Sequence, residues 1–166
     1  VERRKPESPP ADYKPYHPGK DWVAPMANCG DGYRIHVTGL THGENGYPGM
    51  DEKTQANMVN RLVRKIVSNR HDIIRTENIN VDDAEVVVVA YGISARSAKQ
   101  AVREARDKGM RAGLIKLETV WPFPEELIRS IAGRVRALIM PEINAGQMVL
   151  ELQRCAEGKC SVQLLP

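Results

Sequence analysis

Short apolar runs and longer amphipathic stretches follow one another from residue 85 to the end of the chain. The apolar runs are typical of strands buried on both faces of a sheet, and they predict strands at 85–90, 112–117, 136–140 and 162–165. The stretches between them repeat apolar residues with the helical period, and they predict helices at 94–108, 124–132 and 147–157. This alternation with short connections predicts parallel strands with right-handed crossovers, in a three-layer α/β/α sandwich.

The first half of the chain has a less regular pattern. Prolines concentrate there, and we expect residues 1–20 to form an extended linker with polyproline character before an α/β domain at 21–166. Alternating residues at 33–38 predict an edge strand. A further amphipathic helix is expected at 51–67, with Asp51 as its N-cap, and it would be the fourth helix covering the sheet.

Composition excludes several classes of protein. Charged residues make up 27% of the chain with a net charge of only +3, and aromatic residues make up 5%, so neither nucleic-acid binding nor a base-stacking surface is indicated. No apolar run approaches the roughly 20 residues of a membrane span. The three cysteines, Cys29, Cys155 and Cys160, do not form a disulfide framework, so a reducing cytoplasm is the simplest compartment.

The loop at 141–147 is the most informative segment of the chain. It connects a predicted strand to a predicted helix, and such loops lie at the carboxyl edge of the sheet, where α/β domains place ligands and partners. Asn144 is suited to cap the helix, and Gln147 three residues later to reach back to it, as in a capping box. Two interpretations stay open. Glu142, Asn144 and Gln147 contact a partner or ligand, or they only complete the start of the helix.

Residues 91–97 form a second strand-to-helix turn. Ser94 is expected to cap the following helix, and the free amides there, with Ser94 and Arg96, would suit a phosphate or carboxylate. Gly92 stands alone, without the Gly-x-Gly-x-x-Gly pattern of dinucleotide sites, which favours a structural turn. We expect this turn and the 141–147 loop to lie close together at an edge that faces another subunit or domain.

Other residues that could carry chemistry have no informative spacing. His42, Glu44, Asn45 and Asp51 lie near a glycine-rich loop, but their spacing matches no metal-binding pattern. The segment 121–124, Trp-Pro-Phe-Pro, is either core packing or an anchor at a subunit interface. No serine or cysteine nucleophile has a base at a recognisable spacing, so no catalytic, cofactor-binding or metal-binding residue is predicted.

Four segments of the sequence resemble one known family: 38–48, 91–92, 117–124 and 140–147. Their order and spacing are similar to those of the second, C-terminal domain of the alpha subunit of 2-oxoacid:ferredoxin oxidoreductases. The resemblance runs from about Tyr13 to Pro166. That domain is similar in turn to the C-terminal domain of transketolases, which implies a mostly parallel sheet of about five strands.

The resemblance also implies the activity of a larger enzyme. Such enzymes oxidatively decarboxylate a 2-oxoacid to an acyl-coenzyme A, using thiamine diphosphate, Mg²⁺, iron–sulfur clusters and ferredoxin. An earlier alpha-subunit domain and the beta subunit build the thiamine site, and the cluster ligands lie on other subunits. We therefore expect this chain alone to hold no cofactor and to be inactive. Its expected role is that of a non-catalytic assembly domain, contacting the other alpha domain, the beta subunit and further subunits.

A competing interpretation is a free-standing nucleotide- or anion-binding α/β module that uses the turn at Gly92. The missing glycine pattern favours the assembly domain. The mass of the native gene product would discriminate between the two, because an enzyme subunit should be more than twice as long as this chain.

Overall fold

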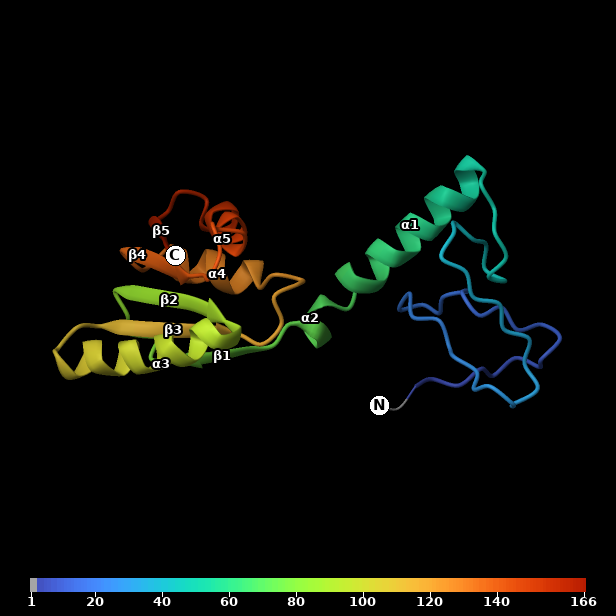
Figure 1. The fold of residues 1–166 in the computed structure, drawn as a ribbon, viewed down its shortest axis with the longest axis horizontal. Coiled ribbons are helices and arrows are strands. Elements are labelled where there is room, and N and C mark those ends of the chain that lie inside the picture. Colours follow the sequence, from blue (N-terminus) through green and yellow to red (C-terminus); the bar gives the residue numbers. More distant parts are fainter. Residues whose placement is uncertain (1–2) are drawn as a thin grey trace. The chain divides into compact units, whose positions relative to one another are not determined.

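The structure is a computed structural model that describes residues 3–166, and these residues form two compact units (Figure 1). The first unit ends at Asp72 and the second begins at Ile73. Residues 3–20 of the expected linker contain no helix or strand and belong to the first unit, while residues 1 and 2 lie outside the described part. Among the described helices, none combines the length and apolar character needed to cross a membrane.

The second unit is built on a mostly parallel sheet of five strands, as expected. The strands are β1 (Thr76–Ile79), β2 (Val86–Tyr91), β3 (Ala112–Leu117), β4 (Ala137–Pro141) and β5 (Ser161–Leu165). They lie in the order β1-β3-β2-β4-β5, and β1 alone runs antiparallel to its neighbour. The residues of β1, Thr-Glu-Asn-Ile, form no apolar run, which is why the hydrophobic pattern does not predict this edge strand.

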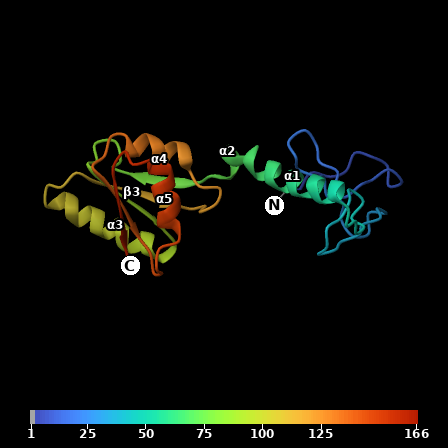
Figure 2. The ribbon, with the colours of Figure 1, turned by 90° about the horizontal axis from the view of Figure 1, so that it is seen from above.

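Helices cover both faces of this sheet, so the three-layer sandwich is confirmed (Figures 1 and 2). On one face α3 (Gly92–Asp107) packs on β2 and β3, and its buried Ala95 and Ala98 allow a close approach. On the other face α4 (Glu125–Ala132) and α5 (Met148–Ala156) pack together over the sheet. This second face holds most of the large buried side chains: Ile128, Ile131, Leu138, Met140 and Leu152.

The start of α3 differs from the sequence prediction. The helix begins at Gly92, two residues before Ser94, and no side chain caps it, so the expected Ser94 cap is wrong. Ser94 lies inside the first turn, where its hydroxyl is no longer at the capping position. Gly92 has a φ of 54°, a left-handed conformation that glycine adopts without steric cost. At the other end Gly109 follows the helix with a φ of 82°, the left-handed conformation in which many helices end.

The first unit contains one long helix, α1 (Glu52–Val67), followed by the short α2 (Arg70–Ile73). Asp51 caps α1 as predicted, because its Oδ1 accepts a hydrogen bond from the Thr54 amide at 2.9 Å. α1 belongs to the first unit, whereas α3, α4 and α5, the helices that pack on the sheet, belong to the second unit.

The edge strand expected at 33–38 is also wrong, because among the described residues no strand pairs with this segment. Side chains hold it instead. The Tyr33 hydroxyl donates to the Ser8 carbonyl at 3.2 Å, and Arg34 donates to the Tyr47 hydroxyl at 2.9 Å. An alternating pattern forms a strand only where a neighbouring strand completes its backbone hydrogen bonds.

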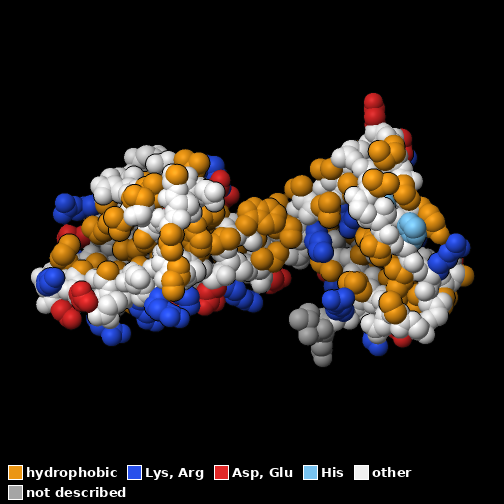
Figure 3. All heavy atoms as spheres, in the orientation of Figure 1, with side chains coloured by type: hydrophobic (Ala, Val, Ile, Leu, Met, Phe, Trp, Pro, Cys, Tyr) orange, Lys and Arg blue, Asp and Glu red, His pale blue; other side chains and the backbone are white. Residues whose placement is uncertain are grey.

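The first unit has no apolar core among its described residues, since every buried apolar side chain of the structure lies at Val81 or later. The apolar stripe of α1 is instead at the surface. Its members Val59, Leu62, Val63 and Val67 are between 41% and 53% exposed. Figure 3 shows hydrophobic side chains at the surface along this helix.

Candidate functional site at the carboxyl edge of the sheet

A buried carboxylate lies directly after β4, in the loop that the sequence pattern identifies. Glu142 is only 2% exposed. Its Oε1 accepts from the Tyr91 hydroxyl at 2.9 Å and from the Asn144 side-chain amide at 3.2 Å. Two backbone amides complete the set, with Met148 donating to Oε1 at 3.1 Å and Val149 to Oε2 at 2.9 Å. One side chain therefore joins the ends of β2 and β4 to the start of α5.

The surroundings of Glu142 keep it ionised. Burial alone would raise the pKa of its carboxyl, but its four hydrogen-bond donors outweigh burial and hold the pKa below its ordinary value. Burial and the hydrogen bond to Glu142 raise the pKa of Tyr91, so the phenol stays protonated and donates. The negative charge also lies at the amino end of α5, where it meets the positive end of the helix dipole.

The capping box expected from Asn144 and Gln147 is wrong. Asn144 Oδ1 accepts from the Gly146 amide at 2.8 Å, and Gln147 occupies the N-cap position without a side-chain bond to the helix. Glu142 caps α5 in their place because the loop folds back through Gly146, whose φ is 96°. Glu142 precedes the first residue of α5 by six positions, beyond the short window in which local capping signals are recognised.

The turn at Gly92 lies beside this loop, because Tyr91 precedes Gly92 and its hydroxyl reaches Glu142. Gly92 and Arg96 are exposed, whereas Ser94 is half-buried. Arg96 makes no ion pair with any residue that the structure describes. The two strand-to-helix turns thus meet through the hydrogen bond between Tyr91 and the buried Glu142.

Large apolar side chains are exposed after each parallel strand. Ile93 follows β2, Trp121 follows β3 and Ile143 follows β4, while Leu165 ends β5; their exposures range from 59% to 81%. Parallel strands end at the same edge of a sheet, so we name these four residues the apolar edge. The sequence suggested Trp121 as a possible interface anchor. It did not indicate Ile93 or Ile143, because a single apolar residue in a loop leaves no periodic signal.

A groove extends from the apolar edge along the α3 side of the sheet. Its volume is about 610 Å³, and Ile93, Ile143 and Leu165 line one part of it. Apolar side chains of β2 and β4, including Val88 and Ile139, line its floor beside α3. The exposed apolar surface of the second unit therefore continues from the loop tips onto the sheet.

The sequence and the fold of the chain have known relatives. Residues 84–165 match the family described as pyruvate:ferredoxin oxidoreductase core domain II. The second unit therefore matches a domain family of the 2-oxoacid:ferredoxin oxidoreductases, and the resemblance that its motifs indicated is confirmed.

Two curated relatives illustrate how the chain matches. Over 165 residues, 99% of its length, it is 45% identical to the 2-oxoglutarate synthase subunit KorA of Methanothermobacter marburgensis, and it covers 44% of that protein. Over 104 residues, 63% of its length, it is 44% identical to the ketoisovalerate oxidoreductase subunit VorB of Methanothermobacter thermautotrophicus, and it covers 29% of that protein. The chain spans less than half the length of these relatives.

A solved structure shares the fold. The 2-oxoglutarate:ferredoxin oxidoreductase from Magnetococcus marinus, with 2-oxoglutarate, coenzyme A and succinyl-CoA bound, matches with a TM-score of 0.84. The match covers 99% of this chain and 29% of that chain at 22% sequence identity. The alternative of a free-standing nucleotide- or anion-binding module is wrong, because the matching proteins are oxidoreductase subunits of which this chain is similar to one part.

Proposed function

We propose that this chain is a non-catalytic assembly part of a multi-subunit 2-oxoacid:ferredoxin oxidoreductase. The whole enzyme would decarboxylate a 2-oxoacid oxidatively to an acyl-coenzyme A and pass the electrons to ferredoxin, in the cytoplasm. The family match supports this proposal, as do relatives named as subunits of a 2-oxoglutarate synthase and a ketoisovalerate oxidoreductase. The partners in the proposal are the other domain of the alpha subunit, the beta subunit and further subunits.

We further propose that this chain holds none of the cofactors of such an enzyme. Within 3–166, no group of three or more His, Cys, Asp or Glu side chains is placed to hold a metal ion. Burial raises the pKa of the Cys155 and Cys160 thiols, which disfavours the thiolate form that iron–sulfur clusters require. In the proposal, thiamine diphosphate, Mg²⁺ and the clusters are held elsewhere in the enzyme, and this chain performs no chemical step.

The apolar edge is the observation that carries the assembly role. Large apolar side chains that stay exposed together mark protein–protein contacts, and tryptophan is among the residues that dominate the energy of such contacts. Glu142 fixes the loop that carries Ile143, so part of this surface is ordered before a partner binds. We propose that the apolar edge, including Trp121, docks on the beta subunit.

The apolar face of α1 supports a second contact. It is exposed in a unit that has no apolar core among its described residues. The curated relatives have more than half of their length outside the region that matches this chain. We propose that the rest of the alpha subunit covers Val59, Leu62, Val63 and Val67, because that polypeptide is covalently attached and therefore present at a high effective concentration.

The test is an association measurement with Ile143→Lys in the alpha subunit that carries these residues. We expect roughly a tenfold or greater loss of affinity for the beta subunit, as for an anchor at the centre of an interface. The matched control is Met110→Lys, which changes a residue of 57% exposure two positions before β3, at the opposite edge of the sheet and the far end of the groove. Affinities that are equal for both variants and the unmodified subunit would overturn the proposal.

A further inference from the structure

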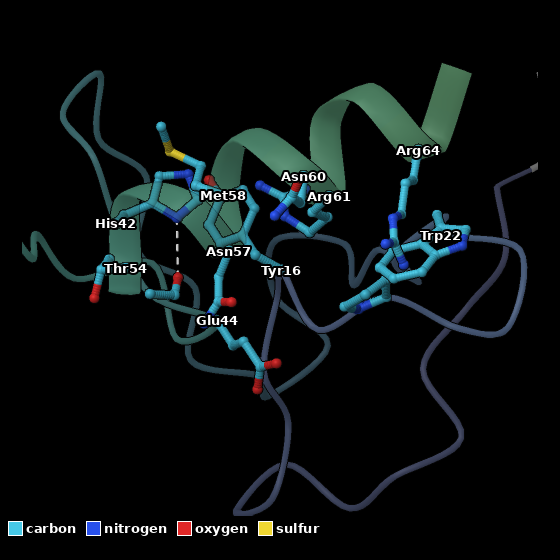
Figure 4. Close-up of a pocket in the computed structure, with 12 residues that line it drawn as sticks. Tyr16, Trp22, His42, Glu44, Thr54, Asn57, Met58, Asn60, Arg61 and Arg64 are labelled. Carbon is cyan, nitrogen blue, oxygen red and sulfur yellow. Dashed lines mark hydrogen bonds between the residues drawn. The ribbon is translucent and has the colours of Figure 1, made fainter. Parts of the chain in front are cut away.

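A cavity in the first unit brings together cationic, amide and aromatic side chains that the assembly role does not use (Figure 4). Its volume is about 440 Å³, and it lies between α1 and the loops that precede it. Its lining includes Asn57, Arg61 and Arg64 from α1 and Tyr16, Trp22 and His42 from the loops.

The helical period places a polar stripe of α1 on this cavity. Thr54, Asn57, Arg61 and Arg64 are separated by three, four and three positions, so they share one face of the helix, and all four line the cavity. The exposed apolar stripe of α1 is centred on the opposite face. The helix therefore turns its polar side towards the rest of its own unit, which makes the cavity wall hydrophilic.

Both arginines lie over aromatic rings. The Arg61 guanidinium lies 5.3 Å from the centre of the Tyr16 ring, and the Arg64 guanidinium lies 4.8 Å from the centre of the Trp22 ring. A cation–π contact of this kind holds the guanidinium beside the ring, and it leaves the N–H groups that do not face the ring available as donors. Neither arginine forms an ion pair with any residue that the structure describes.

Arg61 lacks a counter-ion in a partly buried place. Burial lowers the pKa of Arg61 below its ordinary value, whereas arginines beside a carboxylate, such as Arg106 beside Asp83, have a raised pKa. Among the described lining residues the carboxylate is Glu44, which is already bound by Lys14 at 3.3 Å and by His17 at 2.9 Å. Figure 4 shows the Glu44 carboxylate turned away from both arginines.

We propose that this cavity binds a small ligand through an oxyanion, either a carboxylate or a phosphate group, held by the N–H groups of Arg61 and Arg64 with the Asn57 amide beside them. A guanidinium donates two parallel hydrogen bonds to such a group, and the bonds gain strength from the opposite charges. An oxyanion would also offset the desolvation of Arg61. The proposal does not depend on the assembly role, and it concerns a different unit from the turn at Gly92.

The test uses the two tryptophans of the chain, Trp22 and Trp121, which give two separate indole N–H signals in a nitrogen-15 NMR spectrum. Trp22 lies under Arg64 in the cavity, and Trp121 belongs to the other unit and serves as the internal control. Sodium phosphate is titrated in one arm and sodium succinate in the other, at constant ionic strength set with sodium chloride. We expect the Trp22 signal to move and saturate while the Trp121 signal stays in place.

Variants then assign the donors. Arg61→Gln and Arg64→Gln should each weaken binding by roughly tenfold or more, since each removes a hydrogen bond between charged groups. Arg61→Lys keeps the charge without the planar fork, so it should lose part of the affinity and shows whether Arg61→Gln merely unfolds the unit. Lys65→Gln is the matched control, because it removes one positive charge from the same helix outside the cavity lining.

A saturating shift with phosphate alone, succinate alone or both supports the proposal and assigns the oxyanion. Three outcomes would overturn it: a Trp22 signal that moves with neither anion, Trp22 and Trp121 signals that move in parallel, or a loss of affinity in Lys65→Gln as large as in Arg61→Gln.

Discussion

At the scale of single residues, Glu142 links three elements of the second unit, β2, β4 and α5. Its carboxylate satisfies the first backbone amides of α5 and the phenol of Tyr91 from a position that is shielded from water. A buried donor that loses its acceptor costs about 1–3 kcal/mol. Substituting Glu142 therefore tests the folding of the domain, whereas Ile143, exposed beside it, tests assembly.

Glu142→Gln keeps the size of the side chain but turns one acceptor oxygen into an NH₂ donor that faces other donors. We expect the free energy of unfolding, measured by urea denaturation, to fall by about 2–3 kcal/mol. The control is Glu118→Gln, which changes an exposed carboxylate that follows β3 at the same edge and should alter stability by less than about 0.5 kcal/mol. Equal effects of the two substitutions would contradict the role given to Glu142.

The same carboxylate should make stability depend on pH. Its pKa in the folded protein is lowered, so the unfolded chain binds more protons, and stability must rise with pH in this range. The contribution is complete above the pKa of the unfolded chain and is lost as the pH falls through the lower pKa of the folded state. The stability difference between the unmodified chain and Glu142→Gln should therefore shrink in acid, and a difference that stays constant from pH 7 down to pH 3 would contradict it.

At the scale of elements, α1 differs from the other long helices because its apolar stripe is exposed. Its polar stripe faces the loops of its own unit, and its apolar stripe is exposed. Most of the stability of a protein helix comes from packing of its apolar face, which α1 lacks among the described residues. A helix whose apolar face is exposed unfolds locally at a low cost in free energy. A partner that covers the apolar stripe would raise the free energy of this local unfolding.

Hydrogen exchange can measure this difference. We expect the amides of 59–67 to exchange quickly in the 166-residue chain and at least about tenfold more slowly in the complete alpha subunit, because packing on the other domain removes local opening. Leu62→Gln should reverse much of that slowing while changing the stability of the isolated chain by less than about 0.5 kcal/mol. Exchange rates that are the same in both contexts would show that the rest of the subunit does not cover this face.

At the scale of the whole molecule, the two units differ in what stabilises them. The second has a core on each face of its sheet, whereas the first relies on hydrogen bonds, ion pairs and stacked rings among its described residues. Exposed ion pairs contribute little to stability, so the cooperative unfolding transition should belong to the second unit.

A fragment of residues 73–166 should therefore fold by itself. We expect its thermal unfolding midpoint to lie within about 5 °C of that of the 166-residue chain, because the deletion removes no buried apolar side chain. A fragment of residues 73–156 is the control. It lacks β5, whose Val162 and Leu164 pack against the core, and it should lose the cooperative transition. If 73–166 also unfolds without a cooperative transition, the first unit contributes stability that its burial does not reveal.

The sequence alone determined the parallel strands, most helix boundaries and the family. A buried parallel strand needs a continuous apolar run, and a helix needs caps and a periodic stripe, so both leave signals within a few neighbouring residues. For the same reason the loop after β4 could be identified as the place where function should lie.

Other features were decided only by the tertiary structure, because signals within a few neighbouring residues do not encode them. β1 is a strand because Thr76–Ile79 pairs with Leu117–Leu114, and residues 33–38 are not a strand because nothing pairs with them in the described chain. Asn144 and Gln147 looked like the cap of α5, but Glu142 reaches it through the folded loop. Ile93, Trp121 and Ile143 reach one edge of the second unit only because the sheet aligns the strands that precede them. Each of these features depends on how the backbone folds, and a local sequence pattern does not contain that information.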